Sequence, residues 1–349
     1  MFTPVESALS RASPSLALMK YWGKADSVRN LPATPSLALT LSGLISETRA
    51  WAIPDPRAAD IVFLDTKLQN PERFAAFFDE LRSQLGTTYH FWAQSTNNFP
   101  TAAGLASSSS GFAALTTACA AACGSKATSS SLSAIARRGS GSAARSFFGG
   151  FSVLPTGAEE AHQIYPASFW PELRVIVVRI HDGPKETGSR DGMELTRETS
   201  PYYKAWLDDA AGAFPLALEA LTTRDLSKLG PFIRRSYLRM FATMLGAEPP
   251  LLYWRPDSLA AIALCDQLRK QGAQAWETMD AGPQVKVFTT EHDLQVVLDA
   301  FRSQLPDLGI YVDKAGEGPV TLKKPALRES IHPILQEKAS ALGLALDVL

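Results

Sequence analysis

Residues 97–111 read Asn-Asn-Phe-Pro-Thr-Ala-Ala-Gly-Leu-Ala-Ser-Ser-Ser-Ser-Gly and run directly into an apolar stretch at residues 112–122. Residues 89–94 before them have a strand pattern, so the chain is expected to fold here as strand, loop and helix. A helix that starts after such a loop presents unpaired backbone N–H groups at its positive end, and small side chains let phosphates approach them closely. The segment therefore predicts a nucleotide phosphate site, with serine hydroxyls as further donors or Mg²⁺ ligands. An ordinary Ser-capped helix is the alternative, and no Lys-Ser/Thr pair makes this a Walker loop.

Composition limits the class of protein. The chain has 349 residues, of which 46% are hydrophobic and 20% charged, as expected of a soluble globular protein large enough for two lobes. A net charge of −1 argues against nucleic acid or an anionic membrane as the main partner. The three cysteines form no framework pattern, and Cys119 and Cys123 have no His or carboxylate beside them, so buried thiols are expected rather than a metal site. Because no apolar run of about 18 residues and no leader pattern is visible, the expected location is the cytoplasm.

The pattern of apolar residues predicts an α+β protein. Strands are expected at residues 36–41, 45–53, 61–64, 89–94, 174–180, 274–279 and 284–288 and near residue 311. Helices are expected at residues 71–85, 112–122, 132–138, 200–211, 215–222, 226–245, 258–271 and 292–305. We place a boundary near residue 183, which gives an N-terminal lobe of residues 1–183 and a C-terminal lobe of residues 184–349 that ends in an extra helix beyond about residue 325.

Two clusters in the first half of the chain suit anions. Lys20-Tyr-Trp-Gly-Lys24 follows an apolar segment, and its lysines are placed to hold anionic oxygens; a solvated edge with the aromatic residues in the core is the alternative. The turn Ser140-Gly-Ser-Ala-Ala-Arg-Ser is expected to open a second small-residue helix, whose start is ringed by Ser140, Ser142 and Arg145. A capped helix with a surface arginine is the alternative. Two Gly/Ser helix starts in one chain favour a site for two phosphate esters.

Two clusters in the second half are candidates for closing and activating a site. Lys185-Glu-Thr-Gly-Ser-Arg-Asp-Gly-Met is a polar loop after a buried strand, expected either to close over a site or to link the lobes as a solvated segment. Asp280-Ala-Gly-Pro places a carboxylate in a tight apolar turn. There it can orient a hydroxyl or accept its proton, provided that nearby cations keep it ionised. A turn aspartate bonded to its own backbone is the alternative.

These motifs together resemble the mevalonate diphosphate decarboxylase family, which belongs to the GHMP kinase superfamily. The matches occur in the family's order over residues 14 to about 290, and each is weak alone but specific in combination. They are Lys20-Tyr-Trp-Gly-Lys24 with Ser36-Leu-Ala-Leu-Thr-Leu, Asn98-Phe-Pro-Thr-Ala-Ala-Gly-Leu-Ala-Ser-Ser, Ser140-Gly-Ser-Ala-Ala-Arg-Ser, Ser189-Arg-Asp-Gly-Met and Met279-Asp-Ala-Gly-Pro. The resemblance implies a GHMP-kinase-like two-lobe fold, with a ribosomal-protein-S5-like N-terminal lobe, a ferredoxin-like C-terminal lobe, an active site between them and a homodimer.

The resemblance also implies roles for individual residues. Asp280 matches the catalytic aspartate that orients or deprotonates a tertiary hydroxyl, Lys20 the lysine close to it, and Arg145 the arginine that holds the substrate carboxylate. Residues matching those that grip the diphosphate of the substrate are Tyr21, Lys24, Ser140, Ser142, Ser189 and Arg190. Residues matching the ATP site are Ala103, Gly104, Leu105, Ala106, Ser107, Ser108, Ser109 and Lys185, with Ser107 directed to the metal. The implied reaction consumes ATP with Mg²⁺ and decarboxylates mevalonate diphosphate.

The sequence departs from the family pattern at three places. Ser15 stands where an asparagine is usual, Phe241 stands where a histidine is usual, and Thr187-Gly188 replaces a hydroxyl or β-branched pair. Two alternatives to the diphosphate decarboxylase stay open. One keeps the fold with another reaction, either a decarboxylase of the monophosphate or a kinase that stops at the phosphate ester. The other is a binding protein without catalysis, against which the presence of Asp280 and Lys20 argues.

Overall fold

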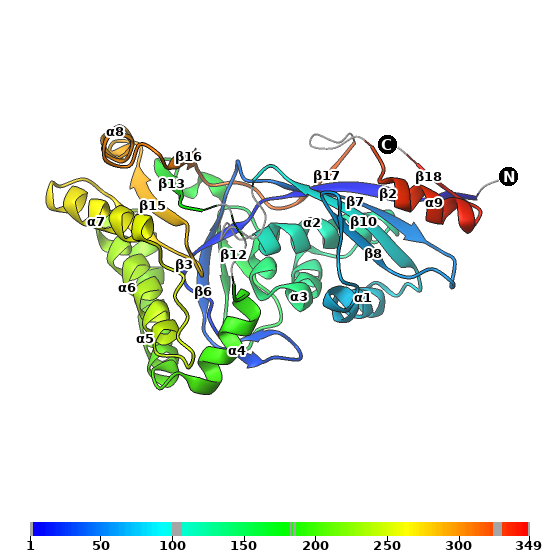
Figure 1. Cartoon of the computed structure of the whole chain (residues 1–349), viewed down its shortest axis with the longest axis horizontal. Coiled ribbons are helices and arrows are strands. Elements are labelled where there is room, and N and C mark those ends of the chain that lie inside the picture. The colour runs from blue at the N-terminus through cyan, green and yellow to red at the C-terminus, as the bar shows by residue number, and fades with distance from the viewer. Residues whose placement is uncertain (1–2, 100–106, 182, 184–185, 324–329, 348–349) are drawn as a thin grey trace.

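The computed structural model describes residues 3–99, 107–181, 183, 186–323 and 330–347. It has two lobes side by side, each built on its own sheet (Figure 1). The first lobe contains a six-stranded sheet in the order β17-β2-β7-β10-β8-β9. Its strands are β17 (Val320–Leu322), β2 (Ser7–Ala12), β7 (Ser46–Ile53), β10 (His90–Asn97), β8 (Ile61–Leu64) and β9 (Lys67–Leu68). The predicted α+β architecture with two lobes is confirmed.

Both faces of the six-stranded sheet are covered, which explains why β7 is buried along its whole length. Successive side chains of a strand point to opposite faces. Ala50 and Ala52 pack against the helices α1 (Glu72–Leu85), α2 (Ser107–Ala122) and α3 (Ser129–Gly139). Trp51 and Ile53 face the other side, where they meet α9 (Pro333–Ala341).

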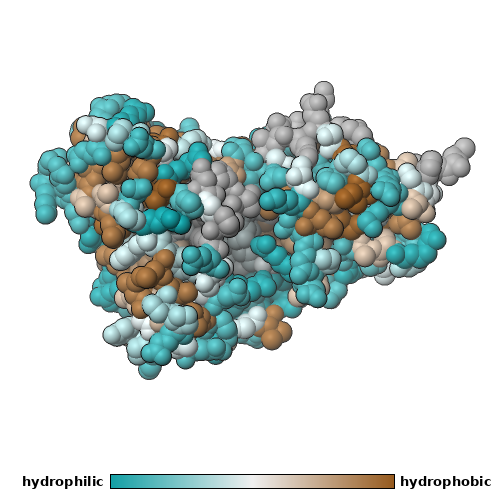
Figure 2. Space-filling model, viewed as in Figure 1, coloured by the Kyte–Doolittle hydropathy of each residue, from teal (hydrophilic) through white to brown (hydrophobic). Residues whose placement is uncertain are grey.

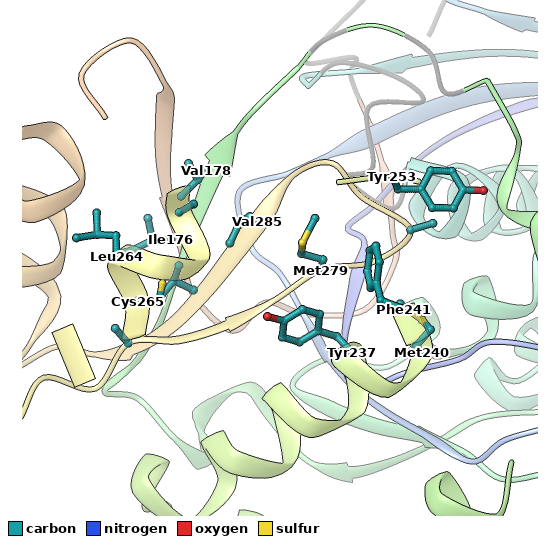
Figure 3. Close-up of a cluster of buried hydrophobic side chains, with 14 of the residues drawn as sticks. Ile176, Val178, Tyr237, Met240, Phe241, Tyr253, Leu264, Cys265, Met279 and Val285 are labelled. Carbon is teal, nitrogen blue, oxygen red and sulfur yellow. The ribbon is translucent and has the colours of Figure 1, made fainter. Parts of the chain in front are cut away.

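The second lobe contains a four-stranded antiparallel sheet in the order β14-β15-β13-β16. Its strands are β14 (Trp276–Thr278), β15 (Val285–Thr290), β13 (Leu173–Arg179) and β16 (Gly309–Asp313), and its helices are α5 (Tyr203–Thr222), α6 (Leu226–Leu245), α7 (Pro256–Lys270) and α8 (Leu294–Gln304). Ile176 and Val178 of β13 pack toward α7. Figure 3 shows Met279, which directly follows β14, among Val285 and the aromatic rings of α6. The end of β14 is thus fixed in a rigid core.

A third sheet joins the two lobes. Its order is β12-β11-β6-β3, with β12 (His162–Tyr165), β11 (Phe151–Leu154), β6 (Ser36–Thr40) and β3 (Ser15–Met19). Leu16 and Leu18 of β3 share one apolar cluster with Val175 and Val177 of β13. The lobe junction is therefore a continuous core, and the residue after β3, Lys20, emerges beside the end of β14.

The sheets divide the chain differently from the predicted ranges 1–183 and 184–349. Strand β13 lies before residue 183 but pairs with β15 in the second lobe, because its alternating apolar residues cover both faces of that sheet. The C-terminal segment returns to the first lobe, where β17 pairs with β2 and β18 (Leu344–Leu346) pairs in parallel with β1 (Thr3–Val5). In Figure 1, α9 accordingly lies near the N-terminus, far from α7 and α8.

The helix start predicted at Ser140 is confirmed, and the helix is of the 3-10 type, η1 (Gly141–Phe147). Two other local predictions were wrong. Residues predicted as a polar loop form the helix α4 (Ser189–Thr199), since Met193 and Thr196 are buried on one of its faces. The two helices predicted on either side of Pro215 are one helix, α5.

Within the described residues, none of the helices is both long and apolar enough to span a bilayer.

Candidate active site

The turn after β14 presents Asp280 to a cavity of about 610 Å³ at the lobe junction. Gly282 in this turn has a φ of +72°, and a Cβ there would lie 2.9 Å from the carbonyl oxygen of Tyr253, so the turn requires glycine. The Asp280 side chain is 25% exposed. Its Oδ1 accepts a hydrogen bond from Lys20 Nζ at 3.0 Å, and its Oδ2 accepts one from Lys286 Nζ at 3.0 Å. The carboxylate is therefore held between two ammonium groups.

Lys20 is fixed by its backbone as well as by its side chain. Its N–H donates to Ser236 Oγ of α6 at 2.8 Å, and its Nζ also donates to the carbonyl oxygen of Ala17 at 2.7 Å. Burial lowers the pKa of Lys20 to about 8, although the Asp280 carboxylate favours the charged form. Burial would raise the pKa of Asp280, but Lys20 and Lys286 outweigh this effect and hold that pKa well below its usual value. Asp280 is thus ionised at neutral pH.

Arg145 of η1 is buried beside this cluster. One of its terminal nitrogens donates to Ser36 Oγ of β6, and its guanidinium carbon lies 6.0 Å from the ring centroid of Tyr21. Burial lowers the pKa of Arg145 to about 10, so the group is still a cation at neutral pH. Within the part of the chain that the structure describes, Arg145 Nε and the Tyr21 hydroxyl are buried without a hydrogen-bond partner. Both residues line the cavity, so an oxygen-rich ligand can satisfy these groups.

A second group of cations lines the cavity beyond Tyr21. Lys24 begins β4 (Lys24–Asp26), and Arg190 lies in the first turn of α4, where it donates to the carbonyl oxygen of Gly139 at 3.2 Å. Burial and the nearby Arg190 lower the pKa of Lys24. Ser189 starts α4, and no side chain caps this helix, so its N-terminal N–H groups remain available to an anion. Trp22 Nε1 donates to Thr196 Oγ1 at 2.9 Å and anchors α4 in this position.

Serine hydroxyls connect the cavity to the start of α2. Ser108 Oγ lies 3.3 Å from Ser140 Oγ, which lies 3.2 Å from Ser142 Oγ. Ser107, the first residue of α2, also lines the cavity. Ser109, predicted to contact the nucleotide, is instead fully buried and is not among the described residues that line the cavity. The candidates Ala103, Gly104, Leu105, Ala106 and Lys185 lie outside the described residues.

The cavity unites the remaining candidates from both halves of the chain. The predicted residues that line it are Lys20, Tyr21, Lys24, Ser107, Ser108, Ser140, Ser142, Arg145, Ser189, Arg190 and Asp280. Sequence reasoning missed other lining residues, among them a mixed polar and apolar group from the first lobe: Val62, Leu64, Gln69, Arg73, Phe74, Ser95, Asn97 and Leu115. No periodicity marks them as a set, because β8, α1, β10 and α2 each contribute only one or two and Gln69 lies just after β9.

The donor set fits Mg²⁺ that arrives with a nucleotide. Among the described residues, no three His, Cys, Asp or Glu side chains cluster as a metal site. Mg²⁺ in phosphoryl-transfer sites is commonly held by phosphates, waters and one or two protein oxygens, and the Ser107 hydroxyl at the start of α2 can be such an oxygen. The three cysteines are unpaired thiols, and Cys119 and Cys265 are buried as expected of core residues.

Two side chains that contact the carboxylate of Asp280 or the guanidinium of Arg145 were not predicted. Lys286 of β15 holds Asp280, and Ser36 of β6 accepts from Arg145. The sequence does contain an indication of Lys286: in Val285-Lys-Val-Phe, a charged residue occupies an inward position of an otherwise apolar strand. The unusual Ser15 bonds Ser142 and Ser146 and so supports η1. Phe241, which stands where a histidine is usual, is buried and stacks on Trp254 with ring centroids 5.0 Å apart.

Two family models cover most of the chain. Residues 12–165 match the model described as Diphosphomevalonate decarboxylase-like N-terminal domain, and residues 175–338 match the Mevalonate 5-diphosphate decarboxylase C-terminal domain. A diphosphomevalonate decarboxylase of Ganoderma lucidum is 34% identical over 342 residues, which cover 89% of this chain and 85% of the relative.

Solved structures agree with the family models. The protein called MDDEF, in complex with MVAPP, AMPPCP and magnesium, has a TM-score of 0.84 and 39% identity over 91% of this chain and 99% of its own. Mevalonate diphosphate decarboxylase from Staphylococcus aureus has a TM-score of 0.85 and 34% identity over 91% of this chain and 98% of its own. These likenesses confirm the GHMP-type fold expected from the sequence.

Proposed function

This chain belongs to the diphosphomevalonate decarboxylase family, and we propose that it catalyses the ATP-dependent decarboxylation of (R)-mevalonate 5-diphosphate to isopentenyl diphosphate, with ADP, phosphate and CO₂ as the other products. One observation carries the proposal: a single cavity holds an ionised aspartate between two lysines at one end and the hydroxyl-rich start of a helix at the other. The first can orient an alcohol, and the second can hold a phosphate chain.

The substrate is proposed to lie between Asp280 and the cations near α4. Its carboxylate pairs with the buried guanidinium of Arg145. The carboxylate oxygen accepts a hydrogen bond from Arg145 Nε, which has no acceptor within the described residues. Its diphosphate meets Lys24, Arg190 and the N-terminus of α4. Tyr21, Ser140, Ser142 and Ser189 add hydrogen bonds around it.

The nucleotide is proposed to lie along the start of α2. Ser107 and Ser108 face the cavity there. Ala103, Gly104, Leu105, Ala106 and Lys185, which lie outside the described residues, complete the predicted ATP site, whereas the buried Ser109 is left out of it. Mg²⁺, held with the phosphates and by Ser107, would neutralise part of their charge.

Phosphoryl transfer comes first in this mechanism. Asp280 accepts a hydrogen bond from the tertiary hydroxyl and aligns its oxygen with the γ-phosphorus of ATP; the new O–P bond forms as the bond to the ADP oxygen breaks. Because the two lysines make Asp280 a weak base, positioning is its main contribution, and the hydroxyl proton passes to the Asp280 carboxylate only late, when the O–P bond is largely formed. Such a late loss suits the loose transition state of phosphoryl transfer. Lys20 faces the cavity and can stabilise the developing negative charge.

Decarboxylation follows. The C–O bond to the tertiary carbon breaks, and its electron pair leaves with the phosphate. The neighbouring C–C bond to the carboxylate then breaks, its electrons form the new double bond, and CO₂ departs. Arg145 holds the carboxylate in place until this step. The cavity walls of Trp22 and Met240 limit water near the tertiary cation, which favours loss of CO₂ over capture by water.

One assay separates this function from its alternatives. The protein is incubated with ATP, Mg²⁺ and either mevalonate diphosphate or mevalonate monophosphate, and ADP and CO₂ are measured separately. Equal ADP and CO₂ with the diphosphate alone supports the proposal. Equal amounts with the monophosphate would indicate a monophosphate decarboxylase. ADP without CO₂ would indicate a kinase, and neither product would leave a binding protein.

We also propose that the protein is a homodimer in the cytoplasm. The family resemblance supports the dimer, and the unpaired thiols suit a reducing compartment. Sedimentation equilibrium tests the first point, because a single species with the mass of one chain would contradict it.

A further inference from the structure

Lys286 lies behind Asp280 rather than in the cavity. Both Lys20 and Asp280 are among the described residues that line the cavity, whereas Lys286 is not. The Lys286 side chain is 3% exposed, and its Nζ lies 3.0 Å from Asp280 Oδ2. Lys286 therefore touches the carboxylate from the protein side, while Lys20 touches it from the side of the substrate.

The sheet determines which way Lys286 points. In the register of the sheet it stands opposite Thr278 of β14 and Val177 of β13, so the three share one face. Val177 and Phe288 belong to the cluster that contains Leu16 and Leu18 of β3. The side chain thus points into the junction between the lobes, toward the end of β3, in a place where an unpaired lysine would be costly to bury.

We propose that Lys286 is a positioning residue for the reaction: it clamps the Asp280 carboxylate from behind, so that one oxygen stays anionic and directed at the substrate hydroxyl. This inference rests on the proposed function. Without the clamp, Asp280 can rotate toward Lys20 and form a closed pair with it, which withdraws both groups from the substrate. The structure offers no second cation on that side of Asp280 among the described residues, since the other ammonium that contacts it is Lys20.

The clamp also has an electrostatic consequence that a merely structural lysine would not have. Among the residues that the structure describes, the charged groups that face the Asp280–Lys20 pair are Lys286 from β15 and Arg145 from η1, while α6 presents the neutral Ser236. The charge of Lys286 lowers the pKa of Asp280 and also lowers the pKa of Lys20. Removing that charge raises both pKa values, so the acidic and the basic limbs of the rate profile both move to higher pH.

The test compares Lys286→Met with wild type in kcat/KM and kcat from pH 5 to pH 10. We expect kcat to fall roughly tenfold to a hundredfold, with a smaller change in KM, because the carboxylate is misplaced while the anion-binding cations remain. We also expect the basic limb to move upward by about one pH unit. Lys286→Arg, which keeps the charge, should return the limbs toward wild-type positions. Should Lys286→Met fail to fold, Lys286→Gln takes its place.

A matched control separates this role from loss of stability. Arg234 pairs with the buried Glu277 of β14 at 2.7 Å and supports the same strand without contacting Asp280. We expect Arg234→Met to lower the melting temperature and to leave both pH limbs in place.

Two outcomes overturn the inference. One is Lys286→Met with unmoved limbs and kcat within about twofold of wild type, in an enzyme that turns over. The other is an unchanged pKa of Lys20 in Lys286→Met, followed by NMR of isotope-labelled lysine side chains and assigned with Lys20→Gln. This second measurement needs no turnover. An inactive wild type with a shifted Lys20 pKa would instead refute the proposed function and leave the electrostatic clamp standing.

Discussion

Replacing Asp280 with asparagine isolates the charge of this carboxylate, because the two side chains have nearly the same shape. In the protein the two oxygens of Asp280 accept from Lys20 and Lys286 at 3.0 Å each. The amide keeps one acceptor oxygen and turns an NH₂ group toward the other ammonium, so one hydrogen bond is lost and the hydroxyl loses its anionic partner. General acid–base groups contribute about 10²–10⁴-fold to rate, which corresponds to roughly 3–5 kcal/mol. We expect Asp280→Asn to lose this much in kcat.

Stability should change less than turnover. One buried lysine loses its hydrogen bond to residue 280, which usually costs about 1–3 kcal/mol. Lys20 can limit this cost by releasing its proton, because its pKa is only about 8. Binding of ATP and of the substrate should persist, since Arg145, Lys24 and the start of α2 are unchanged.

The assay is rapid-quench measurement of ADP, with calorimetry for binding and thermal denaturation for stability. Asp208 lies at an exposed position of α5, where its carboxylate pairs with Lys204 at 2.8 Å. Asp208→Asn makes the same chemical change away from the cavity and should behave like wild type. Turnover of Asp280→Asn within about threefold of wild type would refute the role of Asp280, and so would a loss of nucleotide binding that matches the loss of rate.

The remaining predictions concern the cations of the cavity. Burial lowers the pKa of Lys20 to about 8, and the protonated form is the active one, so kcat/KM should fall above about pH 8. The basic limb of the kcat profile should lie at higher pH, since bound anions favour the charged lysine. A flat profile up to pH 10 would contradict this prediction. Arg145→Gln should lower kcat/KM by about 10²-fold with ATP affinity unchanged, as measured by steady-state kinetics and calorimetry. Arg190→Gln should weaken binding of the diphosphate substrate, seen as a higher KM, by a larger factor than it weakens binding of a monophosphate inhibitor. Equal factors for both ligands would show that Arg190 does not distinguish the diphosphate from the monophosphate.

Hydrophilic side chains cover much of the face shown in Figure 2, with hydrophobic ones gathered in patches on both lobes.

The site itself was predictable mainly where it depends on local sequence. A helix start after small residues, a turn aspartate and a pair of lysines each leave a recognisable pattern, and the structure brings Lys20, Arg145 and Asp280 to one cavity.

Contacts between distant segments were not predictable in the same way. Lys286 reads as one polar residue in an apolar strand, and its importance appears only when β15 is placed against the end of β3. Ser36 is similar, because nothing near it in the sequence indicates that its hydroxyl will accept from Arg145.

The helices show the same division between local and distant causes. The prediction of a helix over residues 226–245 is confirmed by α6, whose apolar residues repeat with helical spacing. α4 was missed because its sequence is polar; it is held by the bond from Trp22 to Thr196 and by burial of Met193, which come from tertiary packing. In α5 the helix continues through Pro215, since burial of the small residues Ala213 and Ala217 offsets the lost backbone bond.

In the proposed mechanism, a phosphoryl group is transferred within one cavity to the tertiary hydroxyl beside Asp280, and that oxygen is then released as phosphate. Labelling this hydroxyl of mevalonate diphosphate with heavy oxygen tests it directly. Mass spectrometry of the released inorganic phosphate should find one heavy oxygen atom in each phosphate, with CO₂ formed in equal amount. Unlabelled phosphate, with the heavy oxygen in water or retained in the organic product, would contradict the mechanism.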